Sequence, residues 1–342
     1  MKISTGLNYA GDIVKAADTV ARLEGAGIDT VWIAEAYSFD AVSLMGYLAA
    51  KTSTVNIGSG ILNIYSRTPS ALGQTAAGLD AVSNGRAILG IGASGPQVIE
   101  GFHGVAYDRP LARTREIIEI CRMMWKREKL VHTGIYNLPL PEGQGTGLGK
   151  PLKLINHPVR EHIPIYVAAI GEKNVTMTAE IADGWLPIFF MPDKAHLVWG
   201  EPLKAGLAKR DPSLPELDVV AGGLLAIGDG LEGIRDFMRP QVALYVGGMG
   251  ARGKNFYNAL ACSYGFEKEA KEIQDLYLDG KKDEAAKLVP AEMLESMTLI
   301  GPEGYVKEKI AAFKEAGVTN LQVTAVSQDP IADLEKLKAW SD

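Results

Sequence analysis

GSGILNIYSRTP, residues Gly58–Pro69, is the stretch of the chain that decides the fold. It follows a short apolar run, Val55–Ile57, and leads into a helical pattern that begins near Pro69. Glycines at the end of a strand allow a flat ligand to lie close to the backbone, because they carry no side chain. Taken alone, the stretch is equally compatible with an ordinary loop between a strand and a helix, so the rest of the chain must decide.

The same order of strand, loop and helix recurs along the whole chain. Strands are expected at Lys2–Asn8, Thr30–Glu35, Val55–Leu62, Arg86–Ala93, Ile165–Ile170, Gly184–Phe189, Leu217–Ile227 and Asn320–Val326. Their apolar character indicates a parallel sheet that is covered on both faces. Repeated strand–helix units of this number predict an α/β fold, a closed (β/α)8 TIM barrel, with an open doubly wound sheet as the alternative.

Two segments interrupt this rhythm, at about 127–163 and 228–301. The first is rich in turn formers, with a small hairpin possible at His132–Tyr136, and the second is mostly of helical pattern. The rhythm resumes behind each segment. We therefore expect one domain over 1–342, with insertions after strands 4 and 7.

Composition narrows the class of protein. The chain has 342 residues, of which 47% are hydrophobic and 22% charged, with a formal net charge of -6. No basic stripe indicates a nucleic-acid partner, and no apolar run reaches the roughly 18 residues of a membrane span. Cys121 and Cys262 are far apart, and Cys121 falls on the apolar side of a helical pattern. We expect a buried free thiol there and a cytoplasmic protein without disulfides.

The residues that follow the strands would line one pocket, because a TIM barrel carries its active site at the C-terminal ends of its strands. They include no metal-binding cluster and no nucleophile–histidine–acid arrangement, so no metal is expected. The five histidines fall in loops, where rim positions are favoured over catalytic ones. A glycine-rich, amide-lined pocket suits a planar cofactor that carries the chemistry itself.

Three strand ends are the candidate sites. Gly90–Gly95 reads GIGASG, and Pro96 behind it favours backbone approach to a ring or ribityl chain, through Gly90, Gly92, Ala93 and Ser94, over a dinucleotide site that needs a helix there. Ala169–Asn174 opens a helix, whose amides together with Lys173 are suited to a phosphate. Glu35 is the candidate catalytic acid, with a structural partnership to a backbone amide or to Arg67 as the alternative.

The motifs together resemble the bacterial luciferase-like flavin and deazaflavin oxidoreductases, in particular the coenzyme F420-dependent branch with methylenetetrahydromethanopterin reductase. The motifs that carry the resemblance are TVWIAE at Thr30–Glu35, the Gly60–Pro69 stretch, LGIG at Leu89–Gly92, ADGW at Ala182–Trp185 and LIGPE at Leu299–Glu303. Similarity covers nearly the whole chain.

The resemblance implies a barrel with insertions, a homodimer, and a non-prolyl cis peptide at Gly60–Ile61 behind the cofactor ring. It also implies that Asn63, Gly92 and Ala93 flank the ring. The phosphate end would map to Ala169, Gly171, Lys173 and Leu186. Asn8, Tyr37 and Tyr65 are the candidates for shaping the substrate pocket.

The chain departs from the F420-dependent glucose-6-phosphate dehydrogenases, which carry a histidine where Ala36 stands and a glutamate where Ala93 stands. Oxidation of that sugar phosphate is therefore not expected. The resemblance implies an F420-dependent oxidoreductase that transfers a hydride between C5 of the deazaflavin and a small organic substrate. An FMN-dependent monooxygenase and a non-catalytic cofactor-binding protein are the alternatives.

Overall fold

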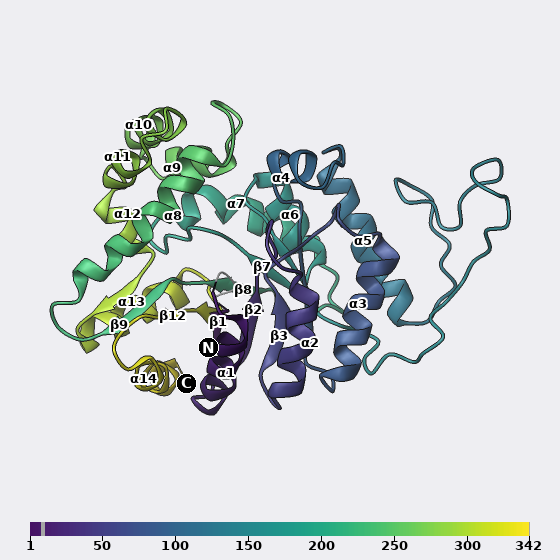
Figure 1. Ribbon diagram of the computed structural model, residues 1–342, viewed down its shortest axis with the longest axis horizontal. Helices are drawn as coiled ribbons and strands as arrows, with labels where there is room; N and C mark the ends of the chain where they lie inside the picture. The colour runs from purple at the N-terminus through teal and green to yellow at the C-terminus, as the bar shows by residue number, and fades with distance from the viewer. Residues whose placement is uncertain (8–10, 342) are drawn as a thin grey trace.

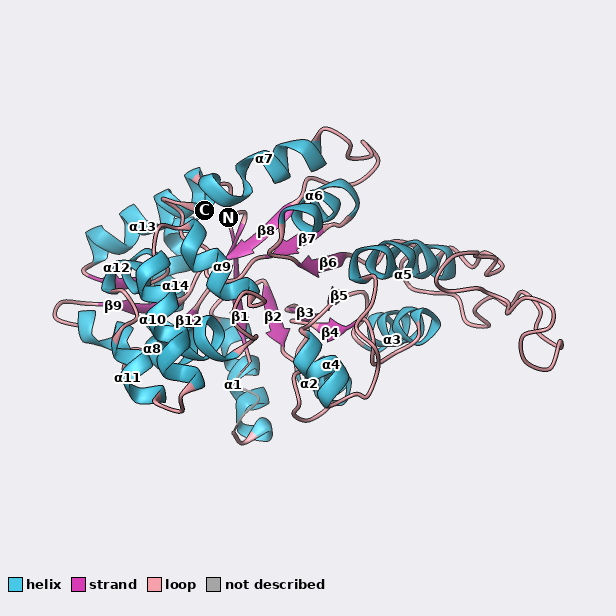
Figure 2. Cartoon of the chain, turned by 90° about the horizontal axis from the view of Figure 1, so that it is seen from above, coloured by secondary structure: helices cyan, strands magenta, loops and turns pink. Residues whose placement is uncertain are grey.

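The computed structural model describes residues 1–7 and 11–341, and its centre is a closed parallel barrel. The strands follow the order β3-β2-β1-β11-β8-β7-β6-β5-β4, and a further pairing of β3 with β5 closes the ring. Figure 2 shows the strands from above, enclosed by helices. The strands of this sheet are β1 (Lys2–Gly6), β2 (Thr30–Ile33), β3 (Asn56–Ser59), β4 (Leu62–Asn63), β5 (Ala87–Gly92), β6 (Ile165–Ala168), β7 (Gly184–Leu186), β8 (Asp218–Ala221) and β11 (Asn320–Gln322). The predicted (β/α)8 TIM barrel is confirmed.

Helices cover the outside of the barrel and build most of the second insertion (Figure 1). The outer helices are α1 (Ile13–Gly25), α2 (Ala41–Lys51), α3 (Pro69–Val82), α5 (Pro110–Trp125), α6 (Glu172–Ile181), α7 (Ala195–Leu207), α13 (Glu303–Glu315) and α14 (Pro330–Ser341). The second insertion holds η1 (Glu232–Met238), α8 (Arg239–Ala243), η2 (Leu244–Gly248), α9 (Phe256–Ser263), α10 (Glu267–Leu278), α11 (Lys282–Lys287) and α12 (Ala291–Ser296). This confirms its predicted helical character.

The third barrel strand is interrupted by a bulge between β3 and β4. Gly58 pairs with Ile88, and Leu62 pairs with Ile91, so four steps along one strand face three along the other. One extra residue of this kind bends a strand and re-aims the side chains that follow it. The peptide bond Gly60–Ile61 within the bulge is cis, as the family resemblance implied.

Aromatic rings fill the barrel beneath its C-terminal end. The rings of Trp32 and Tyr166 lie 5.3 Å apart between their centroids, and Ile88, Val220 and Leu186 pack against them. Gly58 makes room for this packing, because a Cβ there would lie 2.4 Å from the Trp32 ring. The barrel is thus a packed core with a floor under its mouth.

The seventh and eighth strands were each predicted as one strand, and this was wrong. Each divides in two, so that β9 (Leu224–Ile227) and β12 (Thr324–Ala325) leave the barrel and pair with each other in a separate sheet. The break in the seventh strand falls at Gly222, where φ is +152° and a Cβ would lie 2.2 Å from the Gln322 carbonyl oxygen. The sheet also contains β10 (Leu299–Gly301), which the sequence reasoning missed.

The first insertion extends away from the body as an arm over residues 127–163, beyond α3 and α5 (Figures 1 and 2). The expected hairpin is reduced to one antiparallel bridge between His132 and Leu138. Several apolar side chains of the arm are exposed, among them Leu148 at 83% and Ile155 at 92%. These residues therefore find no cover within the chain.

The structure also bears on the state of Cys121 and on membrane-spanning helices. Cys121 is fully buried and free, as predicted, and burial raises the pKa of its thiol to about 12. None of the helices within 1–7 and 11–341 combines the length and the apolar character needed to cross a membrane.

Candidate functional site

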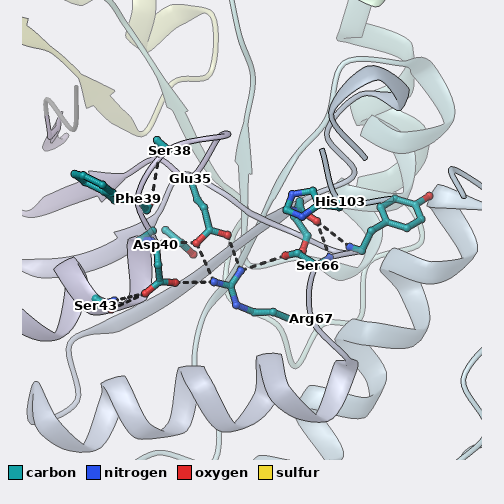
Figure 3. Close-up of polar contacts among 12 residues, drawn as sticks. Glu35, Ser38, Phe39, Asp40, Ser43, Ser66, Arg67 and His103 are labelled. Atoms are coloured by element: carbon teal, nitrogen blue, oxygen red, sulfur yellow. Dashed lines mark hydrogen bonds and ion pairs between the residues drawn. The ribbon is translucent and has the colours of Figure 1, made fainter. Parts of the chain in front are cut away.

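The carboxylate of Glu35, two residues beyond β2, is bound on both of its oxygens. Arg67 donates from Nη1 to Oε1 at 2.6 Å and from Nη2 to Oε2 at 2.8 Å, and the Ala41 amide donates to Oε2 at 3.0 Å. Figure 3 shows the Glu35 and Arg67 side chains facing each other. The Glu35 side chain is 9% exposed, and its hydrogen bonds raise the pKa of Arg67. The structure thus favours the structural alternative for Glu35 over the catalytic role.

Asp40 joins the same cluster from the start of α2. Its Oδ2 accepts hydrogen bonds from the amide and hydroxyl of Ser43, at 2.8 and 2.7 Å, and caps the helix. Its Oδ1 accepts from Arg67 Nη2 at 2.9 Å. Burial raises the pKa of Asp40, but the bonds from Ser43 and the Arg67 charge outweigh it and hold the pKa below its usual value. Arg67 thereby ties the loop after β4 to the loop after β2.

Strand register places three of the predicted site residues in one row at the C-terminal rim. Asn63 pairs with Gly92, Gly92 pairs with Ala168, and Ala168 pairs with Leu186. A Cβ at Gly92 would lie 3.1 Å from Ile61 Cδ1 and 3.3 Å from the Ala168 Cβ. The middle of this row is therefore closely packed, with the Ile61 side chain over Gly92 and no room there for a larger side chain.

Asn63 is buried at 4% exposure, and its side chain bonds in two directions. Its Oδ1 accepts from the amides of Tyr65 and Ser66, at 3.1 and 2.8 Å. Its Nδ2 lies 3.2 Å from His103 Nε2. His103 is half-buried and belongs to the loop between α4 (Pro96–Gly101) and α5, so it lies at the rim as expected for a loop histidine.

Helix α4 itself was not expected, because Pro96 was taken to exclude a helix after Gly95. Pro96 instead occupies the first turn of α4, where a missing amide hydrogen costs nothing. The contact of His103 with Asn63 was also missed. The signal that could have found it is the position of GFHG in the loop after the fourth strand, at the C-terminal face of the barrel.

Gly90 and Ser94 have structural explanations of their own. A Cβ at Gly90 would lie 1.7 Å from the Ser59 carbonyl oxygen, so glycine is needed there by the bulge. Ser94 adopts a left-handed φ of 56°, and its carbonyl accepts a hydrogen bond from the Tyr107 hydroxyl at 3.3 Å. Ala93, between Gly92 and Ser94, is half-buried.

The three residues expected to shape the substrate pocket differ in their surroundings. Tyr65 is buried and its hydroxyl donates to the Asp108 carbonyl at 2.9 Å, and burial raises its pKa to about 12. The structure thus places Tyr65 behind the rim. Tyr37 is 60% exposed, with its ring 6.4 Å from that of Phe102. Asn8 lies outside the described residues.

The predicted phosphate end lies where β6 leads into α6. The carbonyl of Ala169 is already bound by the Trp185 indole at 2.9 Å. Gly171 precedes the helix, with no heavy atom within 4 Å of the place a Cβ would take, and Lys173 in the first turn is exposed. Asn174 Oδ1 is buried without a hydrogen-bond partner. First-turn amides of a helix have no partner within it, so this corner offers donors to an anion.

An aromatic wall from the second insertion was also missed. Phe189, beyond β7, lies with its ring 5.5 Å from that of Tyr245 and 6.3 Å from that of Tyr257. Burial raises the pKa of Tyr257, with contributions from Tyr245 and Tyr107. The wall therefore extends from the end of β7 toward the loop that carries Tyr107. Over the part of the chain that the structure describes, no group of histidine, cysteine, aspartate or glutamate residues could hold a metal ion.

Known proteins share both the sequence and this architecture. The chain is 40% identical over 98% of its length, and 99% of the relative's, to a Mycobacterium tuberculosis protein provisionally assigned as a coenzyme F420-dependent oxidoreductase. It is 30% identical to the 5,10-methylenetetrahydromethanopterin reductase of Archaeoglobus fulgidus, over 88% of this chain and 86% of that protein.

A similar fold occurs in the coenzyme F420-dependent tetrahydromethanopterin reductase from Methanopyrus kandleri. The two structures share a TM-score of 0.80 at 23% identity, over 98% of this chain and 96% of that one. The family model described as luciferase-like monooxygenase matches residues 1–320. The chain therefore belongs to the luciferase-like family and is an enzyme of that family.

Proposed function

We propose that this enzyme uses coenzyme F420 and transfers a hydride between C5 of the deazaflavin and a small organic substrate. The observation that carries the proposal is the 40% identity, along nearly the full length of both chains, to the relative named for F420. The row of Asn63, Gly92, Ala168 and Leu186 supports it from the structure, because its small central residues and the Ile61 side chain over Gly92 give a surface against which a flat ring can lie.

The residues present fit such a cofactor at both of its ends. The cis bulge at Gly60–Ile61 borders Gly92 through the Ile61 side chain, so Ile61 and the small Ala168 would lie against the ring. Near α6, the open position at Gly171 leaves room, and the first-turn amides of the helix are the donors that a phosphate requires. Lys173 would add a positive charge there.

The chain's own contribution is placement. When bound, F420 supplies or accepts the hydride at C5. The Glu35–Arg67–Asp40 cluster holds the loops after β2 and β4 in one position, and Asn63 fixes the turn after β4 through two backbone amides. The floor of Trp32 and Tyr166 closes the barrel below. A site so held keeps the reacting carbon and the substrate at a fixed distance, which is how positioning accelerates a transfer.

An FMN-dependent monooxygenase is the second candidate function. The observation that favours it is the family description itself, which names a monooxygenase. FMN also presents a flat ring and a phosphate, so the same rim and the same corner at α6 would receive it. The alternative of a non-catalytic cofactor-binding protein is set aside, because the chain belongs to a family of enzymes.

The proposal includes a cytoplasmic homodimer acting on a small molecule. The arm supports the dimer, because its exposed Leu148 and Ile155 find cover only against another surface. The arm over 127–163 holds five basic and three acidic residues, whereas the whole chain has a net charge of -6. The free thiols of Cys121 and Cys262 are compatible with a reducing compartment.

The deciding experiment is a fluorescence titration of the purified protein with F420 and, in parallel, with FMN. We expect F420 to bind and FMN to bind far more weakly. A screen of activated alkenes, alcohols and pterins with reduced and oxidised F420 would follow. Tight binding of FMN alone would contradict the proposal and favour the monooxygenase. Binding of neither, together with no turnover, would contradict both enzymatic proposals.

A further inference from the structure

We propose that Asn63 holds His103 as the neutral tautomer protonated on Nδ1, and that His103 uses this N–H to donate a hydrogen bond to an oxygen of the bound cofactor. The tautomer follows from contacts within the chain. The ligand half of the proposal rests on the proposed use of F420.

The orientation of the Asn63 amide is the first step. Its Oδ1 faces two backbone N–H groups, those of Tyr65 at 3.1 Å and Ser66 at 2.8 Å. Both are donors, so they require an acceptor. The opposite assignment would set the side-chain NH2 against two backbone N–H groups within a residue that is only 4% exposed. The amide nitrogen of Asn63 must therefore face His103.

The tautomer of His103 is the second step. Nδ2 of Asn63 can only donate, and it lies 3.2 Å from His103 Nε2. Nε2 must then be the unprotonated nitrogen that accepts. A neutral imidazole that accepts on Nε2 carries its proton on Nδ1. An imidazolium would place an N–H against the Asn63 amide and lose the contact.

The third step is what this tautomer can do. Nε2 is occupied by Asn63, and Nδ1 already carries a proton, so neither nitrogen is free to act as a base. Among the described contacts of His103, Nδ1 has no hydrogen-bond partner. The imidazole also packs edge-on against the Phe102 ring, with 5.1 Å between the two ring centroids. The side chain is half-buried at the rim. His103 is thus a prepared hydrogen-bond donor, comparable to other neutral imidazoles that bind an oxygen.

The position of this donor points to the cofactor. Asn63 begins the row that continues through Gly92 and Ala168, and His103 lies directly on Asn63. In Figure 3, His103 and Ser66 lie together at one end of the polar cluster, and Glu35 and Asp40 lie at the other. A ring that lies against the row would bring its edge within reach of His103, because His103 contacts Asn63 at the start of the row. The acceptor that the donor fits is a carbonyl oxygen on that edge.

The tautomer is tested first, without any ligand. Histidine ring nitrogens of 15N-labelled protein are observed by NMR, and His103→Gln identifies the signals of residue 103 among the five histidines. We expect the Nδ1–H pattern. In Asn63→Asp, the carboxylate still accepts the two backbone amides but now accepts from the imidazole as well, so Nε2 becomes protonated. An Nε2–H tautomer in the unchanged protein at neutral pH would overturn the proposal.

The ligand half is tested with two variants that separate the nitrogens. His103→Asn keeps an N–H near the position of Nδ1 but loses the contact with Asn63, whereas His103→Gln keeps an acceptor for Asn63 and loses the donor. We expect the dissociation constant of F420 to rise about three- to tenfold in His103→Gln and less in His103→Asn. The reverse order would show that His103 only supports Asn63.

Failure of the two proposals can be told apart. If the unchanged protein does not bind F420, the proposed function fails, and the donor role of His103 toward that cofactor fails with it. The tautomer imposed by Asn63 is decided by the NMR spectra alone, so it is refuted or supported whatever F420 does.

Discussion

At the scale of single residues, Arg67 is the centre of the polar cluster at the rim. Its guanidinium binds Glu35 with two hydrogen bonds and Asp40 with a third, and its side chain is 19% exposed. Two-point pairing of this kind is geometrically specific to arginine. The cluster therefore sets the positions of two loops that border the proposed cofactor site.

Replacing Arg67 with alanine should lower the free energy of unfolding by about 3 kcal/mol, because it leaves the Glu35 carboxylate partly buried without its cation. Urea unfolding measures the change. The double variant Arg67→Ala with Glu35→Gln should recover part of the loss, since the unpaired charge is removed. Lys15→Ala is the matched control, because Lys15 is 84% exposed and its ion pair with Asp12 lies at the surface. A loss no larger than the control's would refute the structural role.

The role of Arg67 could be predicted from the sequence only in part. The pairing of Glu35 with Arg67 or a backbone amide was one of two readings, and the structure contains both partners. Nothing in the local pattern distinguishes a free acid from a paired one, because the pairing depends on how two loops meet across strands. The contact between Asn63 and His103 was missed for the same reason, since it joins residues 40 positions apart.

At the scale of elements, the bulge between β3 and β4 is fixed by close packing against β5. The Ser59 hydroxyl donates to the Gly90 carbonyl and accepts from the Gly90 amide, both at 2.8 Å. No side chain fits at Gly90, where a Cβ would meet the Ser59 carbonyl oxygen. The position of the rim thus depends on a glycine that need not touch any ligand.

Gly90→Ala should disrupt the bulge and lower the free energy of unfolding by more than about 3 kcal/mol. Gly101→Ala is the comparison, because that helical glycine has no heavy atom within 4 Å of its added Cβ, and it should be neutral or slightly stabilising. Thermal unfolding of both variants, compared with the unchanged protein, measures the two changes in stability. Similar stabilities for the two would contradict the packing argument.

A carboxylate on α5 is one of the groups that hold the arm to the body. Glu116 accepts the amides of Ile135 and Tyr136, each at 3.0 Å. We expect Glu116→Ala to free the arm and to increase tryptic cleavage after the exposed Lys129, with a small effect on the unfolding temperature. Glu119→Ala is the control, since Glu119 is 52% exposed and lies 3.6 Å from His132. Equal cleavage of the two variants would refute the role of Glu116.

At the scale of the whole molecule, buried carboxylates make the stability of the barrel depend on pH. Burial raises the pKa of Asp183 and of Asp218, but partners outweigh it and hold both below the usual value. These partners are His162, Ile165 and Arg122 for Asp183, and Lys2, Thr319 and Tyr166 for Asp218. Both residues lie at the N-terminal end of the barrel, opposite the candidate site.

Stability should therefore fall in acid. The folded pKa of these groups lies below the unfolded value of about 3.9, so between the two the unfolded chain binds more protons. The stabilisation is complete well above that value and is lost as the pH falls through it toward the folded pKa. Chemical unfolding between neutral pH and pH of about 3 measures the loss. Asp218→Asn should flatten this dependence, and an unchanged slope would contradict the assignment.

The architecture itself was predictable, because it rests on a repeat that the sequence displays. Apolar strand segments recur with helices between them, and both insertions show as breaks in that rhythm. The division of the seventh and eighth strands was not predictable in this way. Gly222 and Gly223 continue an apolar run in the sequence. Glycine is required at both positions because the Gln322 and Met297 carbonyls approach them from distant parts of the chain.

The aromatic floor of the barrel also has an optical consequence. Of the five tryptophans, Trp32 lies inside the barrel, under the proposed cofactor row. Trp125, Trp185 and Trp199 belong to the core outside the barrel, and Trp340 packs against that core. A coloured ligand seated on that row would be an energy acceptor for the Trp32 indole. The protein therefore carries its own emission probes, and quenching of tryptophan fluorescence, with Trp32 the nearest donor below the row, would report when the mouth of the barrel is filled.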